Sequence, residues 1–110
     1  MLEPEFQKKF DAINKKFSQK NIERGYDEIT EAMYSTLKLG EEYGELSEAV
    51  LTALGHQRQS KLDVFQKSDL ESEIADVLIQ TLVIAKHFDV DVNQVVAEKM
   101  NILENKLKDY

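Results

Sequence analysis

Two short runs of acidic residues carry the chemistry that this sequence could perform. The first is Glu41-Glu42-Tyr43-Gly44-Glu45 and the second is Glu73-Ile74-Ala75-Asp76. Each run contains two carboxylates three positions apart, and on a helix such residues lie about one turn apart on the same face. Two neighbouring helices could therefore direct four carboxylates into one space, those of Glu42, Glu45, Glu73 and Asp76.

The expected surroundings of these carboxylates favour a bound cation. Asp76 shares its helix face with Ile79 and Val83, and Glu42 shares its face with Leu46. A carboxylate on an apolar face is costly without a partner, and four close together repel one another. No Lys or Arg lies one turn from Asp76 to neutralise it. A divalent cation held by carboxylate oxygens resolves the conflict; the alternative is a charged face exposed to solvent.

The residue types narrow the chemistry further. Oxygen ligands favour Mg²⁺, Mn²⁺ or Ca²⁺ over Zn²⁺. His56 and His87 lack the Glu three positions earlier that a helical di-iron site requires, and we expect them in a loop and at a helix end. The sequence has no phosphate-binding loop and no dinucleotide-binding fingerprint. Cysteine is absent, which excludes thiol chemistry and disulfides.

Helical periodicity predicts the elements that position the carboxylates. Apolar residues recur at helical spacing in four segments, and few Gly or Pro residues interrupt them. The predicted helices span residues 4–18, 28–54, 68–88 and 92–108, with a polar loop over 56–67. The fold class predicted is all-α, a four- to five-helix bundle in which the apolar stripes face inward.

Local signals set the predicted helix ends. Asp27 is the expected N-cap of the second helix and Gly55 its end. Ser68-Asp69-Leu70-Glu71 and Asp91-Val92-Asn93-Gln94 are predicted capping boxes for the last two helices. The short Asp89-Val90 link predicts that these two helices pack antiparallel. Gly40 and Gly44 within the second helix indicate a bend or a close helix contact.

The length and the net charge of the chain indicate its domain organisation and limit its possible partners. The 110 residues fit one domain, with an N-terminal helix and linker over 1–25 and a bundle core over 27–108. A net charge of -7 disfavours nucleic acid as a partner. The longest apolar run, residues 82–85, is far short of the ~20 residues that span a bilayer, so no membrane association is expected. The absence of a leader and of cysteine predicts a cytoplasmic location.

The two acidic runs together resemble the hallmark of MazG-type nucleoside triphosphate pyrophosphohydrolases. In that family Glu-Glu-x-x-Glu lies on one helix and Glu-x-x-Asp on the next. The residues around both motifs, 39–46 and 73–79, and the spacer 46–72 are similar to the family pattern. Asp89-Val90-Asp91-Val92 followed by Lys99-Met100 is similar to its final helix. The resemblance covers roughly residues 30–106.

The resemblance implies an oligomer of at least two chains and Mg²⁺-dependent cleavage between the α- and β-phosphates of a nucleoside triphosphate. The products would be a nucleoside monophosphate and pyrophosphate, and Mn²⁺ is a possible substitute metal. Transferred by position, the metal ligands are Glu42, Glu45, Glu73 and Asp76. Glu41 matches the family's additional glutamate, as a ligand or as the residue that holds the attacking water.

Further roles follow from the proposed reaction. Glu41 or Glu45 would accept a proton from the attacking water, and Lys38 and Lys99 are candidate contacts to the substrate phosphates. The chain departs from the family at position 103. Members often place Asn four residues after the Lys of the Lys-Met pair, but Leu103 stands here.

Two other functions remain open at this point. One is a phosphoribosyl-ATP pyrophosphohydrolase-like enzyme, which would use the same chemistry on another substrate. The other is a non-catalytic helical oligomerisation or regulatory protein, in which the carboxylates only decorate the surface. The base, the sugar, the number of metal ions and the choice between dimer and tetramer are not determined by the sequence.

Overall fold

Five helices make up the computed structural model, which describes residues 2–109. The helices are α1 (Pro4–Glu23), α2 (Glu28–Ala53), α3 (Gln59–Leu62), α4 (Lys67–His87) and α5 (Val92–Leu107). The all-α prediction is confirmed, since residues 2–109 contain no strand. The polar segment expected to be a loop contains the short α3. Over the described range, every helix is too short or too polar to cross a membrane.

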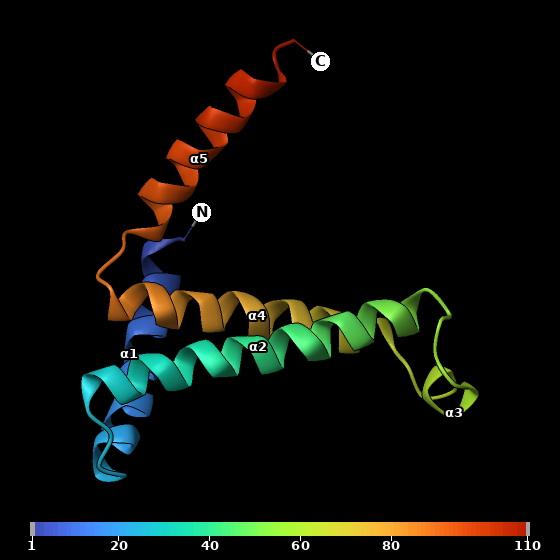
Figure 1. Ribbon diagram of the computed structural model, residues 1–110, viewed down its shortest axis with the longest axis horizontal. Coiled ribbons are helices and arrows are strands. Elements are labelled where there is room, and N and C mark those ends of the chain that lie inside the picture. Colours follow the sequence, from blue (N-terminus) through green and yellow to red (C-terminus); the bar gives the residue numbers. More distant parts are fainter. Residues whose placement is uncertain (1, 110) are drawn as a thin grey trace.

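The antiparallel pair α2 and α4 is the centre of the fold (Figure 1). These two helices lie side by side over most of their length and make most of the contacts between elements. α1 crosses the pair near the start of α2 and the end of α4, and α5 projects away from the same end. The segment with α3 closes the opposite end of the pair and contacts α2.

The ends of α2 follow the local signals. The carboxylate of Asp27 accepts a hydrogen bond from the Thr30 N–H at 2.7 Å, which confirms the predicted N-cap. Gly55 follows the helix with a φ of 79°, a left-handed conformation that glycine adopts without strain. Gly40 and Gly44 lie within the helix, and nothing within 4 Å would meet a Cβ at either position. The close helix contact suggested for them is therefore not made within this chain.

Two predicted helix starts differ in their outcome. The capping box at Ser68 is wrong: α4 begins one residue earlier, and the Gln66 N–H donates to the Asp69 carboxylate at 2.8 Å. Asp69 can do this because it lies three residues after Gln66, the spacing of a capping box. For α5, the Asp91 carboxylate accepts from the Gln94 N–H at 3.1 Å, so this N-cap is confirmed.

α1 is longer than its apolar stripe indicated. It continues to Glu23, because no residue between Ser18 and Gly25 interrupts a helix, and Gly25 with a φ of 83° ends it. Phe6, Phe10, Ile13 and Phe17 recur at helical spacing in α1. Of these four, only Phe10 is buried, while Phe17 is 56 % exposed. The periodicity located the helix correctly but did not identify what covers its apolar face.

The prediction that α5 packs antiparallel on α4 is wrong for a single chain. Asp89 adopts a left-handed φ of 53°, and the Val90 N–H donates back to the Ala85 carbonyl at 2.9 Å. This C-terminal turn of α4 sends the chain away from the helix. The side chain of Asn93 then accepts a hydrogen bond from the Leu2 N–H at 2.8 Å, which ties the start of α5 to the segment before α1.

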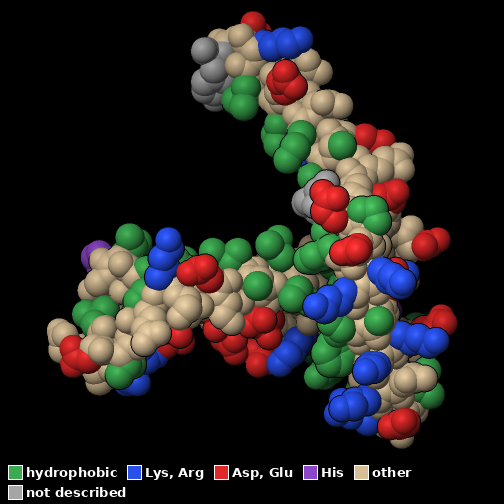
Figure 2. Space-filling view, turned by 180° about the vertical axis from the view of Figure 1, so that it is seen from behind, with side chains coloured by type: hydrophobic (Ala, Val, Ile, Leu, Met, Phe, Trp, Pro, Cys, Tyr) green, Lys and Arg blue, Asp and Glu red, His purple; other side chains and the backbone are tan. Residues whose placement is uncertain are grey.

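The helices do not close into a bundle within one chain. The radius of gyration is 17.3 Å, against about 13 Å for a compact chain of this length. The accessible surface is 8785 Å², against roughly 6,200 Å² for a folded monomer of this mass. Hydrophobic side chains are exposed along α5 and over the central pair (Figure 2). Among residues 2–109, the buried hydrophobic residues are Phe10, Ala49 and Leu82.

Candidate metal centre

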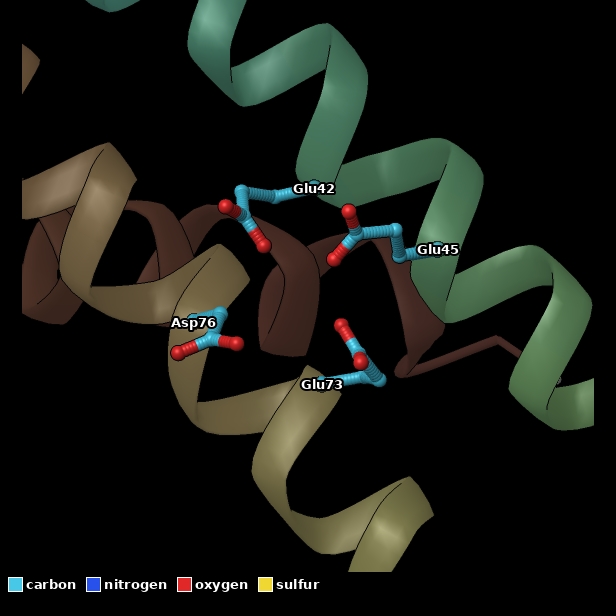
Figure 3. A group of neighbouring side chains, drawn as sticks. All are labelled: Glu42, Glu45, Glu73 and Asp76. Carbon is cyan, nitrogen blue, oxygen red and sulfur yellow. The ribbon is translucent and has the colours of Figure 1, made fainter.

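Four carboxylates converge between the two central helices (Figure 3). α2 supplies Glu42 and Glu45, and α4 supplies Glu73 and Asp76, each pair being separated by three residues. One oxygen from each side chain lies within 4.8 Å of the corresponding oxygens of the other three. The antiparallel pairing of α2 and α4 thus places the two acidic runs opposite each other.

Two oxygens of this group lack any partner. Glu42 Oε2 and Glu73 Oε2 are buried and make no hydrogen bond with the rest of the described chain. The side chain of Glu42 is only 13 % exposed. A buried acceptor without a donor is unfavourable, and it is rare in folded proteins. These two atoms therefore indicate a missing positively charged or hydrogen-bonding partner at this position.

The pKa values of Glu42 and Glu73 also reflect the crowding of negative charge at this position. Burial raises the pKa of Glu42, and the nearby charges of Glu45 and Asp76 raise it further, against the opposing effect of Lys38. Burial also raises the pKa of Glu73, followed by the charge and the hydrogen bond of Glu45. Like charges disfavour ionisation of their neighbours. The chain offers this group too little positive charge to balance four ionised carboxylates.

The donor set fits a hard divalent cation. Mg²⁺ binds oxygen at about 2.0–2.1 Å, so ligands on opposite sides of the ion are about 4.2 Å apart. The limit of 4.8 Å among the four oxygens is close to that value, and small side-chain movements reach it. Carboxylates also suit Mn²⁺, whereas Zn²⁺ prefers nitrogen and sulfur ligands. Glu42, Glu45, Glu73 and Asp76 together can therefore hold such an ion.

The other candidate catalytic and substrate-binding residues lie outside the group of four carboxylates. They are Lys38, Glu41 and Lys99. Lys38 Nζ is 3.1 Å from Glu41 Oε1 and 4.0 Å from Glu42 Oε1, so it lies at the edge of the group. Glu41 itself is 57 % exposed and pairs with Lys38 instead of joining the four carboxylates. Lys99 belongs to α5, which projects away from the central pair, and one chain does not bring it to the carboxylates.

The structure adds one cation that sequence reasoning missed. A cavity of about 230 Å³ adjoins the carboxylates on the side of α3, and its lining includes Glu45, Glu73 and Lys61. Lys61 on α3 pairs with Glu48 on α2. In the sequence this residue is only a lysine within a polar segment, which is a weak signal. Its position depends on α3 folding back over α2, which no periodicity encodes.

Comparison with protein-family models identifies the family of this chain. Residues 28–109 match the family model described as the MazG nucleotide pyrophosphohydrolase domain. The match starts at the first residue of α2 and includes all four carboxylates, while α1 lies outside it. Comparisons with curated proteins and with solved structures found no match.

Proposed function

This chain belongs to the MazG nucleotide pyrophosphohydrolase family, and we propose that it hydrolyses a nucleoside triphosphate to the monophosphate and pyrophosphate with Mg²⁺ as its metal. The observation that supports this most is the convergence of four carboxylates with two buried, unpartnered oxygens. A phosphate-cleaving enzyme needs mainly positioning and charge stabilisation. An acidic group that takes up divalent cations can serve that purpose for a polyanionic substrate.

Each side chain of the site has a proposed role. Glu42, Glu45, Glu73 and Asp76 hold the metal, with Mn²⁺ as a substitute. A bound ion would neutralise part of the triphosphate charge and would lower the pKa of a bound water. Glu41 is outside the four-carboxylate group and partly solvated, so it is available to accept the proton of the attacking water. Glu45, the most exposed of the four carboxylates, is the other candidate for this role.

A panel of nucleoside triphosphates tests the reaction. Each would be incubated with and without Mg²⁺, and monophosphate, diphosphate, pyrophosphate and orthophosphate would be quantified. We expect Mg²⁺-dependent release of monophosphate and pyrophosphate in equal amounts. Diphosphate with orthophosphate as products would place the cleavage at the wrong bond. Absence of turnover across the whole panel would contradict the enzymatic proposal.

Lys38 is proposed to contact the substrate phosphates. Lys38→Met keeps the length of the side chain but removes a charge that lies beside Glu41 and Glu42. We expect KM to rise about 10-fold because one charge-assisted contact is lost. The change in kcat should be smaller. Steady-state kinetics measures both, with Lys106→Met on α5 as the matched control. A Lys38→Met variant with the KM of the wild-type enzyme would exclude the phosphate contact.

We also propose that the chain functions as a homo-oligomer, a dimer or a tetramer. The surface in excess of a compact monomer is roughly 2,500 Å² per chain, taking 8785 Å² against roughly 6,200 Å². That excess is of the size that obligate interfaces bury. The exposed apolar residues of α5, which include Met100 at 63 % and Leu103 at 45 %, are part of the surface to be covered.

Light scattering after size exclusion tests the oligomer. The wild-type chain is expected to elute at a mass of at least twice 12.7 kDa. Leu103→Glu places a charge on the apolar face of α5 and is expected to lower the average mass or the stability, because an unpaired charge cannot be buried in an interface. Asn101→Glu, at an exposed polar position of the same helix, is the control. A monomeric wild-type enzyme with full activity would contradict the proposal.

A further inference from the structure

A second cavity, of about 290 Å³, lies between α1, α2 and α4. Its lining combines aromatic and aliphatic side chains with polar ones. Phe17 of α1 and Tyr34 of α2 contribute the aromatic surface, and Ile79 and Val83 of α4 the aliphatic surface. Ligand cavities typically have apolar walls with a few placed polar groups, and this volume lies at the lower end of their range of ~300–1,000 Å³. It suits a flat heteroaromatic group better than a whole nucleotide.

Buried polar side chains are concentrated in this cavity. Four polar residues of the described chain are buried, and three of them line the cavity: Asn21, Glu31 and Ser35. Ser35 Oγ lies 3.3 Å from His87 Nε2, so it has a partner. Asn21 and Glu31 are each only 8 % exposed. Within residues 2–109 neither side chain makes a hydrogen bond or an ion pair, although three basic side chains share the lining.

Within residues 2–109, the fully buried side-chain oxygens without a partner are Glu42 Oε2 and Glu73 Oε2. The polar atoms of Asn21 and Glu31 therefore remain accessible, and both side chains are free to bond to a ligand in the cavity. The Glu31 carboxylate can only accept hydrogen bonds, whereas the Asn21 amide can donate and accept. A ligand that bonds to Glu31 in the cavity presents an N–H or O–H donor to it. The polar pair and the aromatic walls together fit the hydrogen-bonding edge and the flat faces of a nucleobase.

The cavity is close enough to the metal centre to serve the same substrate. Lys38 lines the cavity and also contacts Glu41 beside the carboxylates. Ile79 lines it from a position three residues after Asp76, a rise of about 4.5 Å along the helix. A nucleotide with its phosphates at the carboxylates can therefore extend its base into this cavity.

We propose that this cavity binds the base of the substrate and that Glu31 selects bases with an exocyclic amino group. The inference rests on the proposed function, since it assigns the base subsite of the same reaction. Cytosine and adenine present amino N–H donors next to a ring nitrogen that accepts. The carboxylate of Glu31 accepts from the amino group, and the Asn21 amide donates to the ring nitrogen.

Bases with a carbonyl in place of the amino group fit this pair less well. In uracil the single imide N–H lies between two carbonyl oxygens, and a carboxylate repels both of them. Such a mismatch leaves buried polar groups unpaired, which lowers kcat/KM strongly. The selecting residue Asn21 belongs to α1, outside the family match over 28–109. Base preference in this chain thus depends in part on a residue of α1, which lies before the matched range.

Matched substrate pairs that differ only by amino against carbonyl test the inference. We would measure kcat/KM for dCTP against dUTP and for dATP against dITP, in wild type and in Glu31→Gln. The wild-type protein is expected to favour the amino member of each pair by about 10- to 100-fold. In Glu31→Gln that ratio should fall at least about 10-fold, because the glutamine amide can donate to a carbonyl. The ratio is internal to each protein, so a change in overall activity does not affect it.

A control and a binding measurement separate the possible failures. Glu23→Gln, on the exposed surface of α1, should keep the wild-type ratio. Calorimetric binding of dCMP and dUMP needs no turnover and should show the same preference, lost in Glu31→Gln. Turnover with equal kcat/KM in each pair, or an unchanged ratio in Glu31→Gln, would overturn the base assignment and leave the proposed function standing. Absence of turnover with preserved dCMP preference would overturn the proposed function but support the subsite, and absence of both would overturn both.

Discussion

Replacing Asp76 with Asn is expected to lower Mg²⁺-dependent kcat by about 100- to 1,000-fold, since metal catalysis supplies several kcal/mol and each 1.36 kcal/mol is a factor of ten in rate. The carboxamide keeps the size of the side chain but removes one of four negative charges that surround the proposed ion. Pyrophosphate release measures the rate, and far-ultraviolet circular dichroism measures the helix content. Helicity should stay near the wild-type level.

The control for this variant is Glu71→Gln on the same helix. Glu71 is exposed and lies outside the group of four carboxylates, so its loss should leave turnover within about twofold. If Asp76→Asn kept wild-type turnover and intact helicity, the four carboxylates would have no part in the reaction. Loss of helicity in Asp76→Asn would be followed by Glu45→Gln, at the most exposed ligand position, where the fold depends less on the side chain.

Glu73→Gln is expected to raise the melting temperature of the metal-free protein at pH 7–8 and to abolish its increase with Mg²⁺. Folding raises the pKa of Glu73 above its ordinary value of 4.5, chiefly through burial. The folded chain then holds a proton that the unfolded chain has lost, so the free energy of unfolding falls as pH rises through that window. At pH 7–8 the free energy of unfolding of the metal-free protein therefore stays lowered. The uncharged amide of Glu73→Gln removes this destabilisation.

Binding of Mg²⁺ is expected to stabilise the wild-type protein, whereas the repulsion among the carboxylates destabilises it. At 100 times its Kd a ligand adds about 2.7 kcal/mol to the native state, which corresponds to a rise in Tm of roughly 10 °C for a domain of this size. The rise should shrink as pH falls toward 4.5, because protonated carboxyls do not bind the ion. Scanning calorimetry of both proteins, with and without Mg²⁺, measures the effect. A metal-free Glu73→Gln that melts below the wild-type protein, or an equal Mg²⁺ shift in both, would contradict this account of the charge repulsion.

The convergence of the carboxylates was predictable because it needs only local rules and the pairing of two helices. Helical periodicity located α2 and α4, and the i, i+3 spacing placed each acidic pair on one face. Antiparallel pairing of the two helices then brought Glu42 and Glu45 opposite Glu73 and Asp76. No detail of loops or caps was required, so the error at Ser68 had no effect on the site.

The arrangement of α1 and α5 was not predictable from the same rules. An apolar stripe indicates which face must be covered but not which helix, or which chain, covers it. Met100 and Leu103 lie on the apolar stripe of α5, which helical periodicity places inward. Both are exposed, because the left-handed turn at Asp89 directs α5 away from α4. The phosphate contact proposed for Lys99 stays a prediction, since one chain holds α5 apart from the carboxylates.

The cavity lined by Asn21 and Glu31 was likewise not predictable from local sequence rules. Neither residue belongs to a recognisable motif, and on helical periodicity each would be placed on a solvated face. Only the crossing of α1 over the central pair brings the two side chains to one cavity. That crossing depends on packing between distant segments, and the sequence contains no local signal for it.

The most direct test of the metal centre is a titration with Mn²⁺ followed by electron paramagnetic resonance, in which bound Mn²⁺ loses the sharp signal of the free ion. The wild-type chain should bind Mn²⁺ in a saturable way that Mg²⁺ competes, and the double variant Glu42→Gln/Asp76→Asn should leave the free-ion signal unchanged at the same concentrations. Equal, saturable binding by both proteins would show that the ion lies elsewhere and would contradict a metal centre between α2 and α4.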